Sequence, residues 1–212
     1  MTTAERLLAG VVHCENREHL SERLNHGESL RIKFGIDPSA PDLHLGHMVP
    51  MRLLRLWQGE GHLPVFVIGD FTARIGDPSG RSATRPQLSV EEVEANAATY
   101  LAQLFCVVDP TRAEVRRQSE WYDGFDLVAV LRLANTATVS QLLQRTDFEQ
   151  RMRSEQAVGV QELFYPLLQA YDSVAVRADV ELGGSDQLFN LLRGRDVQVA
   201  YGQPPQDVIT VP

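Results

Sequence analysis

The chain has 212 residues, of which 43% are hydrophobic, and a formal net charge of −8. This length fits one domain, or one domain with an insertion, that buries roughly 70% of its unfolded surface. The acidic balance argues against a protein whose main task is to grip nucleic acid, because that affinity depends on clustered Lys and Arg. No apolar run approaches the ~20 residues that span a bilayer, and neither a signal-peptide pattern nor a disulfide framework is visible, so we expect a cytoplasmic protein without a membrane segment.

The first part of the chain predicts a helix, a strand, a second helix and a second strand. Apolar residues spaced among charged ones favour a helix over residues 1–28, and residues 30–36 have the pattern of a short strand. A helix is expected over residues 45–58, with four apolar side chains on one face: Leu45, Val49, Leu53 and Leu56. Residues 65–68 are all apolar, which is typical of a parallel strand buried on both faces. This βαβ order predicts an α/β fold with a doubly wound parallel sheet.

The second part of the chain predicts an insertion and the rest of the sheet. Ser89 and Glu92 form a capping box, which indicates that a helix begins there. Residues 112–160 are expected to form a helical insertion, with a strongly apolar helix over residues 127–143. Two further strand patterns follow, at residues 180–183 and 208–211.

A turn with two histidines follows the first predicted strand. The run from Lys33 to His47 contains Asp37 and the tetrad His44-Leu45-Gly46-His47 at the start of a helix. Helix N-termini present free N–H groups to anions, and the two imidazoles can donate to phosphate oxygens. Gly46 leaves room for a flat ring against the backbone. A pair of surface histidines is the alternative interpretation of these four residues, and a zinc site is a weaker one because no other Cys or His cluster completes it.

The loop after the second predicted strand carries further charged residues. It leaves the carboxyl end of the sheet, where open α/β sheets bind ligands. Asp77 can pair with an ammonium group, and Arg74 and Arg81 can face phosphate. For Arg85 a solvated loop is the preferred interpretation, and for Asp70 turn capping is preferred.

Two later segments bring together polar groups of the kind that hold a small ligand. Tyr165, Gln169 and Asp172 fall on one helical face, although an amphipathic surface helix is the commoner explanation of such a stripe. The strand at residues 180–183 ends in Gly183-Gly184-Ser185-Asp186-Gln187, where glycine permits close approach to the backbone and a carboxylate can hold ribose hydroxyls. A tight turn is the alternative for the two glycines.

Taken together, these segments resemble bacterial-type tyrosyl-tRNA synthetase, a class I aminoacyl-tRNA synthetase. The resemblance rests on the His-Leu-Gly-His tetrad, Gly-Asp-Pro-Ser-Gly, Gln-Ala-Tyr-Asp and Gly-Gly-Ser-Asp-Gln, in the family order. It implies a Rossmann-like catalytic domain over residues 1–212, incomplete at its C-terminus and carrying residues 112–160 as its insertion. It also implies activation of L-tyrosine by ATP, with Mg²⁺ carried on the nucleotide, and transfer of the tyrosyl group to tRNA(Tyr).

The resemblance also implies a role for each matching residue. His44 and His47 would stabilise the phosphates as the bond to pyrophosphate breaks, with Gly46 beside them. The remaining assignments place the carboxylates and amides around the two substrates. Asp37 and Asp77 would contact the substrate, with Asp77 on the α-amino group; Tyr165 and Gln169 would hold the polar end of tyrosine; Asp172 would accept the phenol hydrogen; Gly184 and Asp186 would lie at the ribose, and Gln187 near the tyrosine–adenylate junction.

The sequence departs from the family pattern in three ways. Lys33 replaces a tyrosine that many members use at the substrate phenol, and it is the only lysine in the chain. The second family signature, Lys-Met-Ser-Lys-Ser, and the RNA-binding domains are therefore absent from this sequence, so we expect weak activation by this chain alone. A non-catalytic tyrosine- or nucleotide-binding remnant is the alternative function, and another nucleotidyltransferase is disfavoured by the two later motifs. Family members form homodimers through the insertion, here near residues 125–152.

Overall fold

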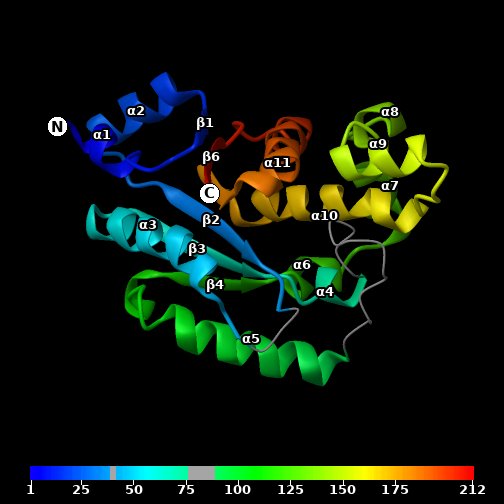
Figure 1. The fold of residues 1–212 in the computed structure, drawn as a ribbon, viewed down its shortest axis with the longest axis horizontal. Helices are drawn as coiled ribbons and strands as arrows, with labels where there is room; N and C mark the ends of the chain where they lie inside the picture. The colour runs from blue at the N-terminus through cyan, green and yellow to red at the C-terminus, as the bar shows by residue number, and fades with distance from the viewer. Residues whose placement is uncertain (39–41, 76–88) are drawn as a thin grey trace.

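A six-stranded sheet forms the centre of the computed structural model, which describes residues 1–38, 42–75 and 89–212 (Figure 1). The strands lie in the order β1-β6-β5-β2-β3-β4, and all neighbours are parallel except β1, which runs antiparallel to β6. Their bounds are β1 His13–Glu15, β2 Arg31–Ile36, β3 Leu63–Ile68, β4 Glu114–Arg117, β5 Val180–Gly184 and β6 Asp207–Val211.

Helices cover both faces of this sheet. The helices α3 (Met48–Gly59) and α5 (Val90–Leu104) lie on one face, whereas α10 (Val160–Val176) and α11 (Leu188–Ala200) lie on the other (Figure 1). The chain leaves β2 in one direction for β3 and β4, and later returns to place β5 on the opposite side of β2. The predicted α/β fold with a doubly wound sheet is therefore confirmed, and its topological switch point lies between β2 and β5.

The N-terminal segment differs from the single helix expected over residues 1–28. It forms α1 (Thr3–Leu7), the strand β1 and α2 (Arg17–Asn25). Gly10 adopts a positive φ of 82°, which ends the first helix and turns the chain towards the sheet. β1 has only three residues, and its pairing with β6 places His13 opposite Thr210. Because this pairing fixes the strand, no local apolar pattern in the sequence predicts it.

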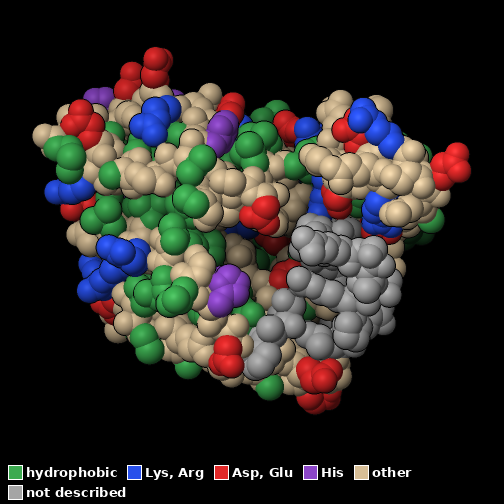
Figure 2. Space-filling view, viewed as in Figure 1, with side chains coloured by type: hydrophobic (Ala, Val, Ile, Leu, Met, Phe, Trp, Pro, Cys, Tyr) green, Lys and Arg blue, Asp and Glu red, His purple; other side chains and the backbone are tan. Residues whose placement is uncertain are grey.

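Helix α3 is found where it was predicted, but it buries a different face. Its core side is formed by Met51, Leu54 and Trp57, each 1% exposed. By contrast, Leu45 is 87% exposed and Val49 is 42% exposed. Of the predicted stripe, Leu56 also stays partly exposed and only Leu53 is buried. The predicted residues are spaced at i, i+4, i+8 and i+11 and the buried ones at i, i+3 and i+6, so each set forms a helical face, and packing against the sheet selects the one with the bulkier side chains. Figure 2 shows the exposed apolar side chains gathered over α3.

The region expected as a helical insertion begins with a strand. β4, within residues 112–160, pairs with β3, so the helical part starts only at Ser119. The expected continuous helix over residues 127–143 is two helices, because Thr138 caps a new one by accepting a hydrogen bond from the Gln141 amide. These helices gather beside α10 (Figure 1): α6 Ser119–Tyr122, α7 Leu127–Ala134, α8 Val139–Leu142 and α9 Thr146–Arg153.

The remaining elements are short turns of helix that lie close to the strand ends. They are η1 Leu45–His47, α4 Thr72–Ile75, η2 Pro110–Arg112 and η3 Ser185–Gln187. The capping box of Ser89 and Glu92 opens α5 as predicted. Within the part of the chain that the structure describes, no helix is long and apolar enough to cross a membrane.

The main hydrophobic core lies between the sheet and the α3–α5 layer. Phe34 and Phe66 meet edge to face there, with ring centroids 6.4 Å apart. Trp57 joins α3 to α1, because its indole N–H donates to the carbonyl of Leu7 at 3.0 Å. A second core, which includes Tyr122 and Leu167, joins α10 to the insertion helices. A smaller cluster formed by Val65, Val67, Val176 and Ala178 packs the end of α10 against β3.

Candidate active site

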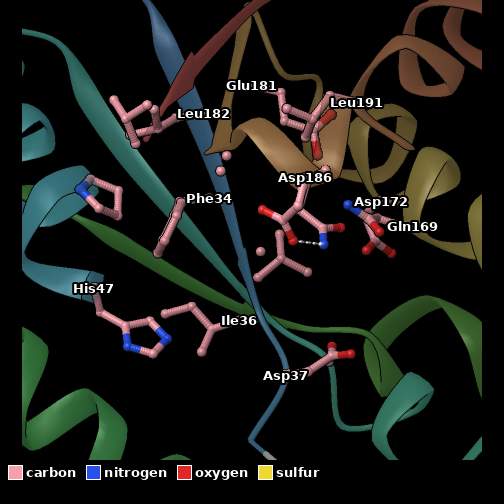
Figure 3. A pocket seen from close by; sticks show the side chains of 18 of the residues that line it. Phe34, Ile36, Asp37, His47, Gln169, Asp172, Glu181, Leu182, Asp186 and Leu191 are labelled. Carbon is pink, nitrogen blue, oxygen red and sulfur yellow. Dashed lines mark hydrogen bonds between the residues drawn. The ribbon is translucent and has the colours of Figure 1, made fainter. Parts of the chain in front are cut away.

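A cavity of about 410 Å³ opens at the carboxyl ends of the strands around the switch point. Figure 2 shows the middle of this face hollowed. All the predicted site residues that the structure describes line the cavity: Asp37, His44, Gly46, His47, Tyr165, Gln169, Asp172, Gly184, Asp186 and Gln187. Asp77 lies outside the described residues, as do Arg81 and Arg85. In Figure 3, His47 lies on one side of β2, and Gln169, Asp172 and Asp186 lie on the other.

The two histidines cap their own turn, and this fixes which ring nitrogens are free. The Gly46 amide donates to His44 Nδ1 at 3.1 Å, and the His44 amide donates to His47 Nδ1 at 3.2 Å. Because each Nδ1 accepts a hydrogen bond, a neutral ring carries its proton on Nε2. Both imidazoles therefore keep an Nε2–H donor for an oxygen atom of a ligand.

The histidine rings also pack against each other, at a centroid distance of 4.0 Å. Partial burial, followed by the neighbouring His44, lowers the pKa of His47, which favours the neutral donor form. A Cβ atom on Gly46 would lie 2.9 Å from the His44 ring. The absence of a side chain at Gly46 therefore makes room for the His44 ring, and the ligand contact expected at Gly46 stays a prediction.

The polar stripe of α10 faces the cavity as predicted, although Pro166 lies inside the helix rather than in its first turn. The Tyr165 hydroxyl donates to Asp37 Oδ2, and the Thr72 hydroxyl donates to Asp37 Oδ1 at 3.0 Å. The end of β2 is thereby joined to α10 and to the turn after β3. These bonds hold a carboxylate and a phenol at the mouth of the switch point.

Asp172 lies deeper and is 2% exposed. Its carboxylate accepts hydrogen bonds from Gln118 Nε2 at 2.7 Å, Trp121 Nε1 at 3.2 Å and the Tyr122 hydroxyl at 3.4 Å. Burial raises the pKa of Asp172 from 3.8 to about 7, against the opposing effect of the Lys33 ammonium. Burial therefore shifts this carboxyl towards its neutral form, in a site that presents it to the cavity.

The end of β5 supplies an exposed carboxylate and an amide. Gln187 Nε2 donates to Asp186 Oδ2 at 2.8 Å (Figure 3). Asn190 Nδ2 donates to Gln187 Oε1 at 3.1 Å. A Cβ atom on Gly184 would lie 2.5 Å from Asp186 Oδ1, so glycine is needed for this turn. The turn holds two hydrogen-bonding groups at the opposite wall from the histidines.

Three cavity residues were not anticipated from the sequence. Thr72 and Gln118 form a relay, because Gln118 Oε1 accepts from the Thr72 amide at 2.9 Å while its Nε2 donates to Asp172. A Cβ atom on Gly69 would lie 1.8 Å from Asp37 Oδ1. Gly69 directly follows an apolar strand, so the sequence pattern marks its position at a strand end. Gln118 follows a strand without an apolar run, so no such pattern marks its position.

Within residues 1–38, 42–75 and 89–212, no group of three or more His, Cys, Asp or Glu side chains is arranged to hold a metal ion. The donors at the cavity are imidazole N–H groups, amides and separate carboxylates. Such a set suits a polar organic ligand with an anionic part.

Comparison with known proteins gives a consistent result. The family described as tRNA synthetases class I (W and Y) matches residues 25–212. A protein of Dehalococcoides mccartyi named tyrosine–tRNA ligase is 54% identical over 206 residues, which are 97% of this chain and 52% of that protein. A tyrosine–tRNA ligase of Thiobacillus denitrificans is 55% identical over 193 residues, or 91% of this chain and 49% of that protein. The chain thus spans about half the length of the curated relatives it matches.

A solved structure shows a similar architecture. The C-terminally truncated mitochondrial tyrosyl-tRNA synthetase of Aspergillus nidulans has a TM-score of 0.86 to this chain at 25% sequence identity. The match covers 100% of this chain and 69% of that chain.

Proposed function

The chain belongs to the class I tRNA synthetases of the tryptophan and tyrosine group, and from this we propose that it is the catalytic part of a tyrosine–tRNA ligase. The observation that carries the proposal is that one cavity contains both the His44–His47 turn and the polar stripe of α10. The first suits a phosphate chain and the second suits the polar groups of an amino acid.

The proposed first reaction joins tyrosine to ATP. A carboxylate oxygen of tyrosine forms a bond to the α-phosphorus, and the bond from that phosphorus to the bridging oxygen of pyrophosphate breaks. The tyrosine carboxylate is already ionised at neutral pH, so the step needs no general base. The Nε2–H groups of His44 and His47 would donate to oxygens that gain charge, and Mg²⁺ would arrive with the nucleotide. The tyrosyl group would then pass to tRNA(Tyr).

Selection of tyrosine would rest on Asp172. Its carboxylate has three donors from the protein and still faces the cavity, so a substrate phenol can donate a further hydrogen bond. Phenylalanine would leave this buried acceptor without that partner, and such sites discriminate by roughly 10⁴–10⁵. Asp37, Tyr165, Gln169 and the predicted Asp77 would hold the amino acid's polar end. Gly184, Asp186 and Gln187 would contact the ribose and the adenylate junction.

We also propose a homodimer through the insertion. Large apolar side chains are exposed on α7, on α8 and α9 and at the start of α10: Leu127, Val128, Leu131, Val139, Met152 and Val160. An exposed apolar area of this kind marks an interaction site in soluble proteins. A two-fold contact between copies would bury it without a second partner.

Tyrosine-dependent exchange of pyrophosphate into ATP tests the catalytic proposal, and calorimetry tests tyrosine binding separately. His44→Ala should leave tyrosine binding unchanged and lower exchange by about 10²–10³, the usual cost of losing one such donor. His26→Ala, at an exposed position at the end of α2, is the matched control. Loss of tyrosine binding in His44→Ala would contradict the phosphate role, and absence of tyrosine binding by the unaltered chain would contradict the assignment of the pocket.

A further inference from the structure

Lys33 lies in the middle of the sheet and is completely buried. Its ammonium forms an ion pair with Glu181 Oε1 at 2.8 Å, and it donates to the Gln169 carbonyl at 2.8 Å and to Ser173 Oγ at 3.0 Å. An ammonium has three N–H donors, so each has a partner. Glu181 is the direct cross-strand neighbour of Lys33, because β2 and β5 pair with these two residues in register. The lysine does not line the cavity.

The carboxylate of Glu181 is enclosed just as tightly. Its Oε2 atom accepts from Ser173 Oγ at 3.2 Å and from the side-chain amide of Gln206. Helix α11 closes over this cluster at Gly194, where a Cβ atom would lie 3.0 Å from Glu181 Oε2 and 2.4 Å from Gln206 Nε2. Glu181 also lines the cavity, whereas Lys33 does not. A buried charged pair that is hydrogen-bonded in this way holds the elements around it in one arrangement.

Two partners of Lys33 belong to the turn of α10 that carries the polar stripe. The Gln169 carbonyl and the Ser173 hydroxyl bracket Asp172, and Glu181 fixes the lysine from the sheet side. We propose that Lys33 is a positioning residue for the tyrosine pocket, which fixes residues 169–173 of α10 on the sheet and thereby sets the position of the Asp172 carboxylate. This inference rests on the proposed function, in which that carboxylate accepts the phenol hydrogen.

The charges around Asp172 agree in sign with this role. Lys33 from β2 is the strongest influence that lowers the pKa of Asp172, whereas burial raises it most and Glu181 from β5 and Asp37 raise it further. Tyr122 from α6 faces the same carboxylate and donates to it. The effect of Lys33 exceeds that of Glu181, so removing both should raise the pKa of Asp172.

The test compares two double variants of the same chain. Lys33→Met with Glu181→Gln removes both charges and leaves a side chain of similar length, a change that buried ion pairs often tolerate. Arg31→Met with Glu114→Gln is the matched control, because that pair also joins two strands of the sheet, β2 and β4 on either side of β3, at 2.8 Å, and lies partly exposed. The readouts are a ¹³C NMR titration of the Asp172 carboxyl without ligand, and tyrosine binding by calorimetry from pH 6 to 9.

We expect the Asp172 midpoint to rise by about one pH unit in the first double variant and to stay unchanged in the control. Tyrosine affinity at pH 7 should fall about fivefold, because the ionised fraction falls from about one half to one tenth, and it should recover by pH 9. An unchanged midpoint, or an affinity loss that does not depend on pH, would overturn the positioning role. If the methionine variant does not fold, Lys33→Gln with Glu181→Gln is measured in its place.

The outcomes also separate this inference from the proposed function. Absence of tyrosine binding by the unaltered chain would remove the proposed function, while the NMR titration would still report whether Lys33 sets the ionisation of Asp172. Normal tyrosine binding together with an unchanged titration in the double variant would overturn the inference and leave the proposed function standing.

Discussion

The burial of Asp172 predicts a specific dependence of stability on pH. Its folded-state pKa of about 7 lies above the value of 3.8 for an exposed carboxyl. A raised pKa means that the folded chain binds more protons between these two values, so this contribution to stability is complete at pH 4 and is lost as pH rises through 7. A shift of about 3 units corresponds to roughly 4 kcal/mol across the whole range.

Asp172→Asn removes the titrating group while keeping its size. The amide places an NH₂ group where a carboxylate oxygen accepted from Gln118, Trp121 or Tyr122. At least one donor then loses its partner, at a cost of about 1–3 kcal/mol that does not depend on pH. The variant should therefore be the less stable protein near pH 5, and the difference should shrink or reverse by pH 8.

Urea unfolding at pH 5, 6, 7 and 8 measures this difference directly. From pH 5 to pH 7 the stability of the unaltered chain should fall relative to Asp172→Asn by about 2 kcal/mol, and the difference should level off above pH 8. Asp123→Asn provides the control, because Asp123 is an exposed aspartate near the same insertion helices. A constant difference between the two proteins across these pH values would refute a raised pKa at Asp172.

Three further changes test the packing and the assembly. In urea titrations, Gly194→Ala should lower the free energy of unfolding by about 1–3 kcal/mol, because the added Cβ atom meets the polar cluster under α11. Gly59→Ala should raise the free energy of unfolding by about 0.5–1 kcal/mol, because a Cβ atom there has no neighbouring atom within 4 Å. Trp57→Ala should cost about 3–5 kcal/mol by the same assay, because it empties a buried site and frees the Leu7 carbonyl. Leu131→Glu, at a 59% exposed position, should shift sedimentation from dimer to monomer without lowering the melting temperature.

The parts of the site that the sequence could predict all have local patterns. Asp37 directly follows β2, the histidine turn opens the helix after β2, and the segment from Gly184 to Gln187 ends and follows β5. On α10, Tyr165, Gln169 and Asp172 are spaced at one helical face. Parallel strands bring their carboxyl ends to one edge, so these segments meet once the fold class is known. Their meeting in one cavity follows from topology, whereas the roles proposed for them await the assays above.

The elements that the sequence did not predict depend on distant partners. β1 and β4 are edge strands of three and four residues, and Glu114-Val115-Arg116-Arg117 has no apolar run because only one side has a strand neighbour. Gln118 was missed for the same reason, since its place in the relay follows from where β4 ends. The apolar residues of α3 fit two helical faces equally well, and only the packed sheet distinguishes them.

Lys33 shows most clearly how sheet register decides the meaning of a residue. A single lysine near a motif that can bind phosphate suggests a cation for an anionic ligand. Side chains alternate along β2, however, so Lys33 faces α10 while Phe34 faces the core on the opposite side of the sheet. Burial of a charge is unfavourable without a partner, and the partner comes from β5, nearly 150 residues later, in direct register. Because the same lysine touches the turn that holds Asp172, a substitution that is neutral for cavity shape should still alter the charge state of the proposed tyrosine acceptor.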